Sequence, residues 1–358
     1  MNARTPHPEV GSDTVPVPPR RSRVLVTGAT GFLGRAIVTA LATRPDVEVV
    51  AACRRPERLP AGVTGEVRAG DLRDPDYRAA VLDGTDVVCH AGTWGAFWGH
   101  AEQERREFFE PTRDLVDRAI NSGVRRFIQT STLAIAARPT GDGPVDDFAP
   151  TRRTGFWPHL DLLIDLDDHM RRHSRHGTQM ITMRLGHFVG AGNNLGMVPA
   201  LVPRLRTRLV PWLAGGRARL PLVADTDLGE AFALAATAEH LDDYESFNIV
   251  GPTLPTAREV IEFIADETGS PRPAFSVPYT AGYAFARLME TLHPVLPGPA
   301  PFLTRSLVHV SENWNCRNDH ATRTLGYTPR KHWRTAVRES LAAGKTHGHP
   351  WPRLAPQT

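Results

Sequence analysis

Residues 23–34 read Arg-Val-Leu-Val-Thr-Gly-Ala-Thr-Gly-Phe-Leu-Gly, and this stretch decides the fold. An apolar run passes there into glycines at positions 28, 31 and 34, and residues 36–41 continue with the apolar spacing of a helix. The pattern predicts a strand, a tight turn and a helix. Glycines at this spacing let the chain turn sharply, approach a pyrophosphate without Cβ atoms and pack the helix closely on its strand, with the phosphates at the helix N-terminus. We therefore expect a bound dinucleotide, the alternative being a glycine-rich turn that binds nothing.

The stretches that follow alternate between strand and helix patterns. Apolar runs typical of strands lie at residues 47–52, 86–92, 126–132 and 180–185, and helical spacing is found over residues 108–122 and 165–175. Repeated alternation of this kind is typical of a parallel sheet that binds ligands at the carboxyl ends of its strands. We predict an α/β fold with a Rossmann-type doubly wound parallel sheet, in an NAD(P)-binding domain over residues 23–190.

The composition changes after this domain. Prolines between residues 199 and 221 interrupt short apolar segments. We expect a smaller C-terminal substrate lobe over residues 191–340, with some later segments returning to the sheet. The proline-spaced apolar stretch at residues 278–302 either walls an apolar pocket or packs as core. Residues 1–22, rich in proline and polar side chains, are expected to form a disordered tail, and residues 341–358 a flexible one.

The composition also argues against several kinds of partner. The formal net charge is only +3 and no basic stripe occurs, so no nucleic-acid binding is expected. Cys53, Cys89 and Cys316 lack the paired spacing of a metal or redox motif, so we expect reduced thiols, no metal and a cytoplasmic location. No apolar run reaches membrane-spanning length, and the N-terminus lacks the apolar core of a signal peptide.

Two arginines bear on the choice of dinucleotide. Arg54 and Arg55 lie about 20 residues past the glycines, where an NAD-specific fold presents an acidic residue to the ribose hydroxyls. Arginine at this place suits a 2′-phosphate, so we favour NADP(H) over NAD(H); the alternative is a solvated surface arginine. Asp71 closes the next expected strand and can accept a hydrogen bond from an adenine amino group, or else cap its loop. The small residues at 91–92 end the following strand and would let the cofactor lie against the backbone.

Five motifs in order and spacing carry a family resemblance. They are Thr27-Gly28-Ala29-Thr30-Gly31-Phe32-Leu33-Gly34, Gly70-Asp71-Leu72, His90-Ala91-Gly92 with Trp94-Gly95, Thr130-Ser131-Thr132 and Arg184-Leu185-Gly186. Over about residues 23–340 the chain resembles the extended short-chain dehydrogenases/reductases of the NAD-dependent epimerase/dehydratase type. It is most similar to their 3β-hydroxysteroid dehydrogenase and 2-alkyl-3-oxoalkanoate reductase branch, whose members also carry Trp-Gly after the fourth strand. The resemblance implies that the cofactor is bound by Gly28, Thr30, Gly31, Phe32, Leu33, Gly34, Arg54, Arg55, Asp71, Leu72, His90, Ala91, Gly92 and Thr130.

The catalytic part of the resemblance is incomplete. Family chemistry uses a Ser or Thr that orients the substrate oxygen, a Tyr that exchanges its proton, and a Lys four residues later that lowers the tyrosine pKa and holds the nicotinamide ribose. Thr132 can fill the first role, but the Tyr position falls on Trp157 and the Lys position on Asp161. No other register restores the pair, since no lysine precedes residue 331 and no tyrosine lies between residues 77 and 244.

Other side chains must then be weighed as proton donors. An indole has one N–H and does not titrate, so Trp157 can hydrogen-bond a carbonyl but cannot exchange a proton with it. Asp161 can accept hydrogen bonds from ribose hydroxyls or act as a base. His187 follows the sixth expected strand in the loop that in the family borders the nicotinamide, which places it ahead of His159 and His90. We take Thr132, Trp157, Asp161 and His187 as catalytic candidates.

Three classes of function remain open at this stage. The first is an NAD(P)(H)-dependent oxidoreductase of a small hydrophobic hydroxy or keto substrate, such as a β-hydroxy or β-keto acid, with a non-standard proton donor. The second is a non-redox cyclase, lyase or isomerase that uses the same pocket. The third is a non-catalytic NADP-binding partner or sensor. A homodimer formed through a pair of helices is a further expectation that the resemblance carries.

Overall fold

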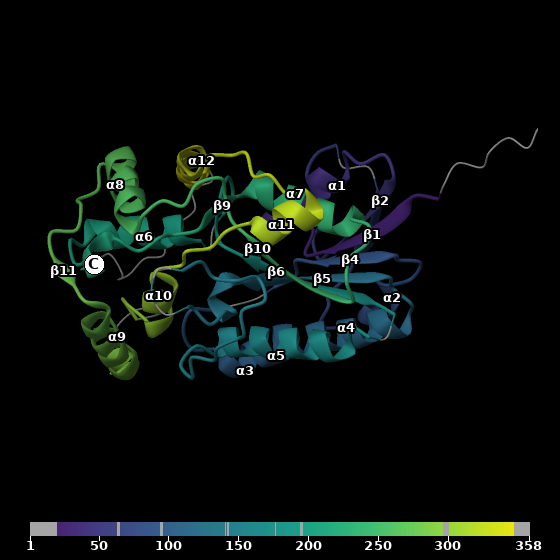
Figure 1. The fold of residues 1–358 in the computed structure, drawn as a ribbon, viewed down its shortest axis with the longest axis horizontal. Helices are drawn as coiled ribbons and strands as arrows, with labels where there is room; N and C mark the ends of the chain where they lie inside the picture. Colours follow the sequence, from purple (N-terminus) through teal and green to yellow (C-terminus); the bar gives the residue numbers. More distant parts are fainter. Residues whose placement is uncertain are drawn as a thin grey trace, which may run out of the picture.

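A computed structural model describes residues 20–62, 65–93, 96–139, 141, 143–175, 177–193, 196–295 and 301–346. Its centre is a seven-stranded parallel sheet with strand order β10-β6-β5-β4-β1-β2-β3 (Figure 1). The strands are β1 (Ser22–Thr27), β2 (Val47–Cys53), β3 (Glu66–Ala69), β4 (Val87–His90), β5 (Arg126–Thr132), β6 (Gln179–Leu185) and β10 (Tyr244–Ile249). The strand order reverses between β1 and β4, so the predicted doubly wound α/β sheet is confirmed.

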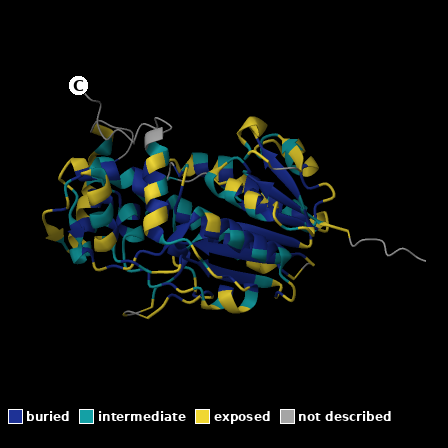
Figure 2. Ribbon diagram, turned by 90° about the horizontal axis from the view of Figure 1, so that it is seen from above, coloured by how far each residue is buried: buried dark blue, intermediate teal, exposed yellow. Residues whose placement is uncertain are grey.

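Helices cover both faces of the sheet (Figure 1). One face carries α1 (Phe32–Leu41), α7 (Asp225–Thr237) and α11 (Asp319–Leu325), and the other carries α2 (Pro75–Ala80), α4 (Glu110–Asn121) and α5 (Pro158–His173). Alternate residues of β1 point to opposite faces, as the two-residue period of a strand requires. Val24 and Val26 pack with α1 and α7, Leu25 packs with α4, and all three are fully buried. Figure 2 shows the sheet buried between helices whose outer faces are exposed.

A second lobe lies beside the carboxyl ends of the strands (Figure 1). It contains the strands β7 (His187–Val189), β8 (Trp212–Leu213), β9 (Leu222–Ala224) and β11 (Ser276–Val277), and the helices α6 (Met197–Arg206), α8 (Ala257–Thr268), α9 (Tyr279–Leu292), α10 (Arg305–Val310) and α12 (Trp333–Thr346). Its core is built largely from β7, β9, α6, α8 and α12. Although they follow residue 190, α7, β10 and α11 lie with the sheet, and α12 continues past the expected boundary at residue 340.

Short helical turns link these elements. They are η1 (Pro56–Arg58), α3 (Ala101–Glu104), the π-turn η2 (Arg105–Phe109), η3 (Leu133–Ile135), η4 (Ala214–Gly216) and η5 (His293–Val295). The predicted helix at 108–122 is thus divided into η2 and α4, and Pro111 lies in the first turn of α4, directly after the π-turn.

The prediction for α5 was wrong at its start. A helix was expected over residues 165–175, but α5 begins at Pro158 and ends at His173. Pro158 occupies the first helical position, where its fixed φ angle suits a helix, and Asp161 adds the acidic charge favoured in a first turn. The buried residues Leu160, Leu163 and Ile164 form the inward face of this first half. Two more turns of helix therefore reach toward the carboxyl ends of the strands.

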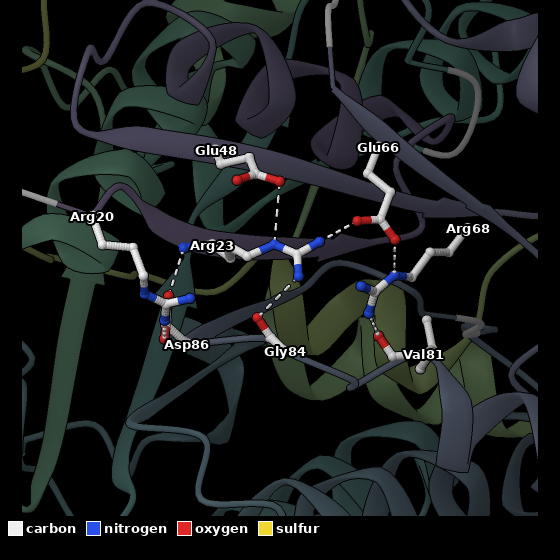
Figure 3. Close-up of polar contacts among 8 residues, drawn as sticks. All are labelled: Arg20, Arg23, Glu48, Glu66, Arg68, Val81, Gly84 and Asp86. Carbon is white, nitrogen blue, oxygen red and sulfur yellow. Dashed lines mark hydrogen bonds and ion pairs between the residues drawn. The ribbon is translucent and has the colours of Figure 1, made fainter.

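The amino ends of the strands are joined by charged side chains (Figure 3). The Arg23 guanidinium of β1 pairs with Glu48 of β2 and Glu66 of β3, and the Arg23 N–H donates to Asp86 Oδ2 over 2.7 Å. Arg68 of β3 donates to Glu66 over 2.6 Å. This edge of the sheet is thus occupied by protein contacts, whereas the glycine turn lies at the opposite, carboxyl edge.

Membrane-spanning helices and clusters of metal ligands are both lacking among the described residues. None of the helices described is at once long and apolar enough to cross a membrane. Within the same residues, no three or more His, Cys, Asp and Glu side chains gather as metal ligands.

Candidate functional site

Each glycine of the turn meets a different demand. Gly28 has φ +64°, and a Cβ on it would lie 2.9 Å from the Ala91 carbonyl oxygen and from Gly92. A Cβ on Gly34 would lie 2.1 Å from the Gly28 carbonyl oxygen, so α1 packs directly on the turn. Gly31 is exposed and has an ordinary backbone; a Cβ there would meet only the Gly28 oxygen at 3.2 Å. Gly28 and Gly34 are needed by the fold, and Gly31 leaves open backbone on the ligand side.

The N-terminus of α1 is suited to an anion. Its N-cap is Gly31, which offers no side-chain hydrogen bond, and the first turn carries no acidic residue. The first N–H groups of a helix have no partners within the helix and lie at the positive end of its dipole. Thr30 precedes the cap, Leu33 packs against the core, and Phe32 stacks on Phe188 with ring centroids 5.6 Å apart. Helix N-termini of this kind bind the phosphate groups of dinucleotides.

The residues expected at the adenosine end lie together at the same edge. Arg54 and Arg55 are exposed just after β2. The Arg54 Nη1 atom lies 4.0 Å from Asp71 Oδ2, and Arg73 donates to the same oxygen over 2.6 Å. The hydrogen bonds from Arg73 hold the pKa of the Asp71 carboxyl below its usual value. Leu72 points at Gly92, since its Cδ1 would lie 3.3 Å from a Cβ there.

His90 is buried and hydrogen-bonded within the core, which is not the environment expected of a proton donor. Its Nδ1 lies 2.8 Å from Thr27 Oγ1 and its Nε2 lies 3.1 Å from Thr112 Oγ1, so both ring nitrogens are engaged inside the core. Burial lowers the pKa of His90 to about 4, and the ring is neutral at pH 7. The Thr130 hydroxyl donates to the His90 carbonyl oxygen over 2.7 Å. His90 therefore joins β1, β4 and α4, and Trp94-Gly95 lies outside the described residues.

A small cavity of about 210 Å³ lies where β5 and β6 end. Thr132, Trp157 and His187 line it, as does His159, the second-ranked histidine of the sequence analysis. Thr132 Oγ1 accepts the Ala134 N–H over 3.3 Å, and its hydroxyl hydrogen has no acceptor among the described residues. The His187 Nε2 donates to the Val310 carbonyl oxygen over 3.1 Å, and burial lowers the pKa of this imidazole. Three of the four catalytic candidates thus meet in one cavity.

The roles expected of Trp157 and Asp161 need correction. The Trp157 indole N–H donates to the Ala96 carbonyl oxygen over 2.9 Å, so it is not free to bond a substrate. The ring stacks on Phe97 at 5.4 Å and forms a wall of the cavity. Asp161 does not line the cavity; its carboxylate accepts the Thr154 N–H, and burial raises its pKa. Trp157 is the N-cap of α5, whereas Asp161 lies within its first turn. The two side chains therefore need not point the same way, and the four-residue spacing in the sequence does not reveal this difference.

A second, larger cavity of about 770 Å³ adjoins the first within the C-terminal lobe. The two share Phe97, His187, Gly196, Met197 and Val310. Nearly all of its lining is aliphatic or aromatic, and it includes Ala281, Phe285, Met289 and Phe302. The apolar stretch at 278–302 therefore walls a pocket, as one of the two expectations had it.

Comparisons with known proteins fit this architecture. The family described as "NAD dependent epimerase/dehydratase family" matches residues 24–250. The chain belongs to this family.

A 2-alkyl-3-oxoalkanoate reductase from Stenotrophomonas maltophilia (strain K279a) is 26% identical over 327 residues, which cover 86% of this chain and 94% of that protein. A 3 beta-hydroxysteroid dehydrogenase/Delta 5-->4-isomerase from Mycobacterium tuberculosis (strain CDC 1551 / Oshkosh) is 37% identical over 120 residues, 32% of each chain. The crystal structure of gox2253 superposes with a TM-score of 0.72 at 23% identity, covering 92% of this chain and 99% of that one.

The small cavity departs from the usual chemistry of an epimerase/dehydratase family member. Among the described residues that line it, none is a tyrosine or a lysine. Lys331 lies elsewhere, paired with Asp225 and Glu339. The first turn of α5, Pro158 to Asp161, contains no lysine or arginine, and its cavity-lining side chain is His159. Glu104, which the sequence analysis did not single out, lies behind His159 with a fully buried side chain. No sequence motif marks it, because its partner is distant along the chain.

The glycine turn yields a prediction that separates binding from folding. Gly31→Val should abolish binding of NADPH and NADH while the protein stays folded, because its Cβ needs only a small adjustment of the Gly28 oxygen at 3.2 Å and the rest of the side chain enters the expected ligand space. Gly34→Val is the matched control and should lower the unfolding temperature strongly, since its Cβ would meet the Gly28 oxygen. Fluorescence titration with both cofactors and thermal unfolding measure the two effects. Undiminished cofactor affinity in Gly31→Val would show that the turn serves the fold alone.

Proposed function

We propose that the chain is an NAD(P)(H)-dependent oxidoreductase that acts on a hydrophobic hydroxy or keto substrate, of the β-hydroxy or β-keto acid class. The observation that carries the proposal is the pair of joined cavities, a small one that holds Thr132 and a large apolar one behind it. The first would take the reacting carbon, and the second the alkyl or ring skeleton. The similarity to a 2-alkyl-3-oxoalkanoate reductase over most of both chains supports this substrate class.

Residues of this chain would bind the cofactor, orient the substrate and exclude water. The Gly31 turn and the α1 N-terminus bind the pyrophosphate, and a nicotinamide would supply or accept a hydride at the carboxyl ends of the strands. Thr132 donates a hydrogen bond to the substrate oxygen and so orients the carbonyl carbon. Trp157 and Phe97 exclude water by closing one side of the cavity. Proton transfer by a positioned side chain contributes about 10²–10⁴-fold to rate, so a donor other than tyrosine is needed for efficient turnover.

The absence of the family tyrosine and lysine also supports a second candidate function. A cyclase, lyase or isomerase could use the same cavities with the nicotinamide in a structural role. The two functions differ in one observable: a non-redox enzyme converts its substrate without any net change in nicotinamide absorbance. A non-catalytic NADP-binding sensor would give no product at all, and its cofactor binding would instead change association with another protein.

Cofactor preference is tested at the end of β2. We expect NADP(H) to bind at least tenfold more tightly than NAD(H), because Arg54 is exposed beside the ribose-reading position and charge-assisted bonds to phosphate are strong. Arg54→Ala should remove this preference, while Arg58→Ala, a nearby exposed arginine, should retain it. Calorimetric titration with both cofactors decides the matter. Equal affinities in the unmodified protein would contradict the NADP assignment.

Substrate class is tested with a series of 2-alkyl-3-oxoalkanoate esters of increasing chain length. NADPH oxidation and product mass are followed together, and kcat/KM should rise with chain length as the large cavity fills. Ala281→Trp, which places an indole in that cavity, should lower kcat/KM for long chains about tenfold or more and spare short ones. Ala284→Trp on the same helix, outside the cavity lining, is the matched control. Equal losses for short and long chains would contradict the assignment of the large cavity.

A further inference from the structure

His159 and Glu104 form a buried pair beside the small cavity. The His159 Nδ1 atom lies 3.7 Å from Glu104 Oε1, and the side chains are 15% and 0% exposed. His159 lines the cavity, whereas Glu104 lies behind it. His159 Nδ1 and Glu104 Oε2 are both buried, and neither has a hydrogen-bond partner in the described part of the chain. Because Nδ1 is turned to Glu104, Nε2 is the ring nitrogen left for a molecule in the cavity.

Contacts from three segments fix this pair in place. Glu104 ends α3 and accepts the Ala96 N–H, and the Ala96 carbonyl oxygen in turn accepts the Trp157 indole N–H over 2.9 Å. The His159 ring packs between the rings of Phe108 and Trp157, with its centroid 5.7 Å and 6.3 Å from theirs. The indole that replaces the family tyrosine thus anchors Ala96, whose N–H bonds the Glu104 carboxyl group beside the imidazole.

The burial of this pair would contribute little to the stability of the fold. Buried polar groups are normally hydrogen-bonded, and a carboxyl group placed behind an imidazole without closing a hydrogen bond gains little for the fold. Catalytic hydrogen bonds are often long before substrate binds and shorten in the complex, so 3.7 Å is compatible with a working contact. Burial raises the pKa of Glu104 to about 7, although the hydrogen bond from the Ala96 N–H acts to lower it. Burial lowers the pKa of His159 to about 4. No other charged side chain contributes to either shift.

We propose that His159 is the general acid of this site and that Glu104 is the positioning residue that supplies its proton. This inference rests on the proposed oxidoreductase function. When a hydride adds to the carbonyl carbon, the C=O π pair moves to oxygen, and that oxygen takes the proton from His159 Nε2. The Nε2–H bond breaks as Nδ1 takes the proton of the Glu104 carboxyl group, which leaves a neutral imidazole and a carboxylate.

The site is restored by one solvent proton. Water delivers a proton to Nε2, and the Nδ1 proton returns to Glu104. The net reaction consumes the ketone, one hydride and one proton and gives the alcohol. In the reverse direction the same groups would accept the alcohol proton. The neutral imidazole acts here as a donor and an acceptor at once, which its two distinct ring nitrogens allow.

The test compares His159→Gln and Glu104→Gln with His240→Asn, a fully exposed histidine, using the 2-alkyl-3-oxoalkanoate ester that the unmodified enzyme reduces fastest. His159→Gln should lower kcat by about 10²–10⁴-fold, the usual contribution of a general acid, with NADPH affinity and KM changed only a few-fold. In the unmodified enzyme kcat for reduction should fall as pH rises through about 7, because Glu104 loses the proton to be donated. Glu104→Gln should abolish that fall, and His240→Asn should behave as the unmodified enzyme.

A nitrogen NMR titration of the imidazoles in the full chain supplies a readout that does not need turnover. His159 should stay neutral between pH 5 and 8, and Glu104→Gln should move its Nδ1 resonance. Unchanged kcat in a folded His159→Gln, or a His159 resonance indifferent to Glu104→Gln, would overturn the inference while leaving the oxidoreductase function intact. If His159→Gln does not fold, retention of the high-pH fall in Glu104→Gln overturns it. Reduction of neither the esters nor the corresponding free β-keto acids by the unmodified enzyme would overturn the proposed function, and the inference with it.

Discussion

The close approach of β1 and β4 at their carboxyl ends constrains everything else in this molecule. Gly28 can take φ +64° and leave room for the Ala91 carbonyl and Gly92 only because it has no Cβ. The contact lies where the strand order reverses, and α1 turns away from it directly, held by the equally tight contact of Gly34 with the turn. A crevice follows from this geometry, because neighbouring strands connect to opposite faces of the sheet at that point. The helix N-terminus, the arginines after β2 and the small cavity all border the same edge.

The parts of the fold that depend on local chemistry could be predicted from the sequence. The turn at Gly28, the strand runs and the alternation of elements follow from side-chain size and periodicity, which neighbouring residues carry. The start of α5 was missed because the apolar periodicity was sought after Asp165, although Pro158 is the residue that sets the helix in place. Some segments after residue 190 were expected to return to the sheet, and the structure identifies them as α7, β10 and α11.

In the candidate site, too, the sequence predicted which residues occupy the key positions but not what their side chains contact. The family resemblance places Trp157 and Asp161 at two functional positions, but it cannot state where their polar atoms point. The indole N–H is bonded to a carbonyl of a distant loop, and the Asp161 carboxylate accepts the Thr154 N–H while its Oδ1 has no partner among the described residues. Glu104 was not foreseen, because only the folding of α3 against α5 brings it beside His159. Long-range contacts of this kind leave no local pattern.

Apolar surface dominates both cavities, and this limits the chemistry they can support. A hydrophobic skeleton would displace water from the large cavity and place its polar end beside Thr132 and the two histidines of the small one. In so apolar a setting a lysine would be expensive to bury, whereas a neutral imidazole is not. The replacement of the tyrosine and lysine by tryptophan and aspartate is therefore consistent with a drier site that retains its cofactor turn.

The central claim, that these cavities hold hydride transfer, is tested most directly by isotope tracing. The chain is incubated with a 2-alkyl-3-oxoalkanoate ester and NADPH that carries deuterium at nicotinamide C4, each of the two C4 diastereomers in turn. Hydride transfer in these cavities predicts a β-hydroxy product one mass unit heavier with one of the two diastereomers, with the deuterium at the carbinol carbon. Product formed from the ester without deuterium from either diastereomer, at constant nicotinamide absorbance, would contradict it and point to non-redox chemistry in the same cavities.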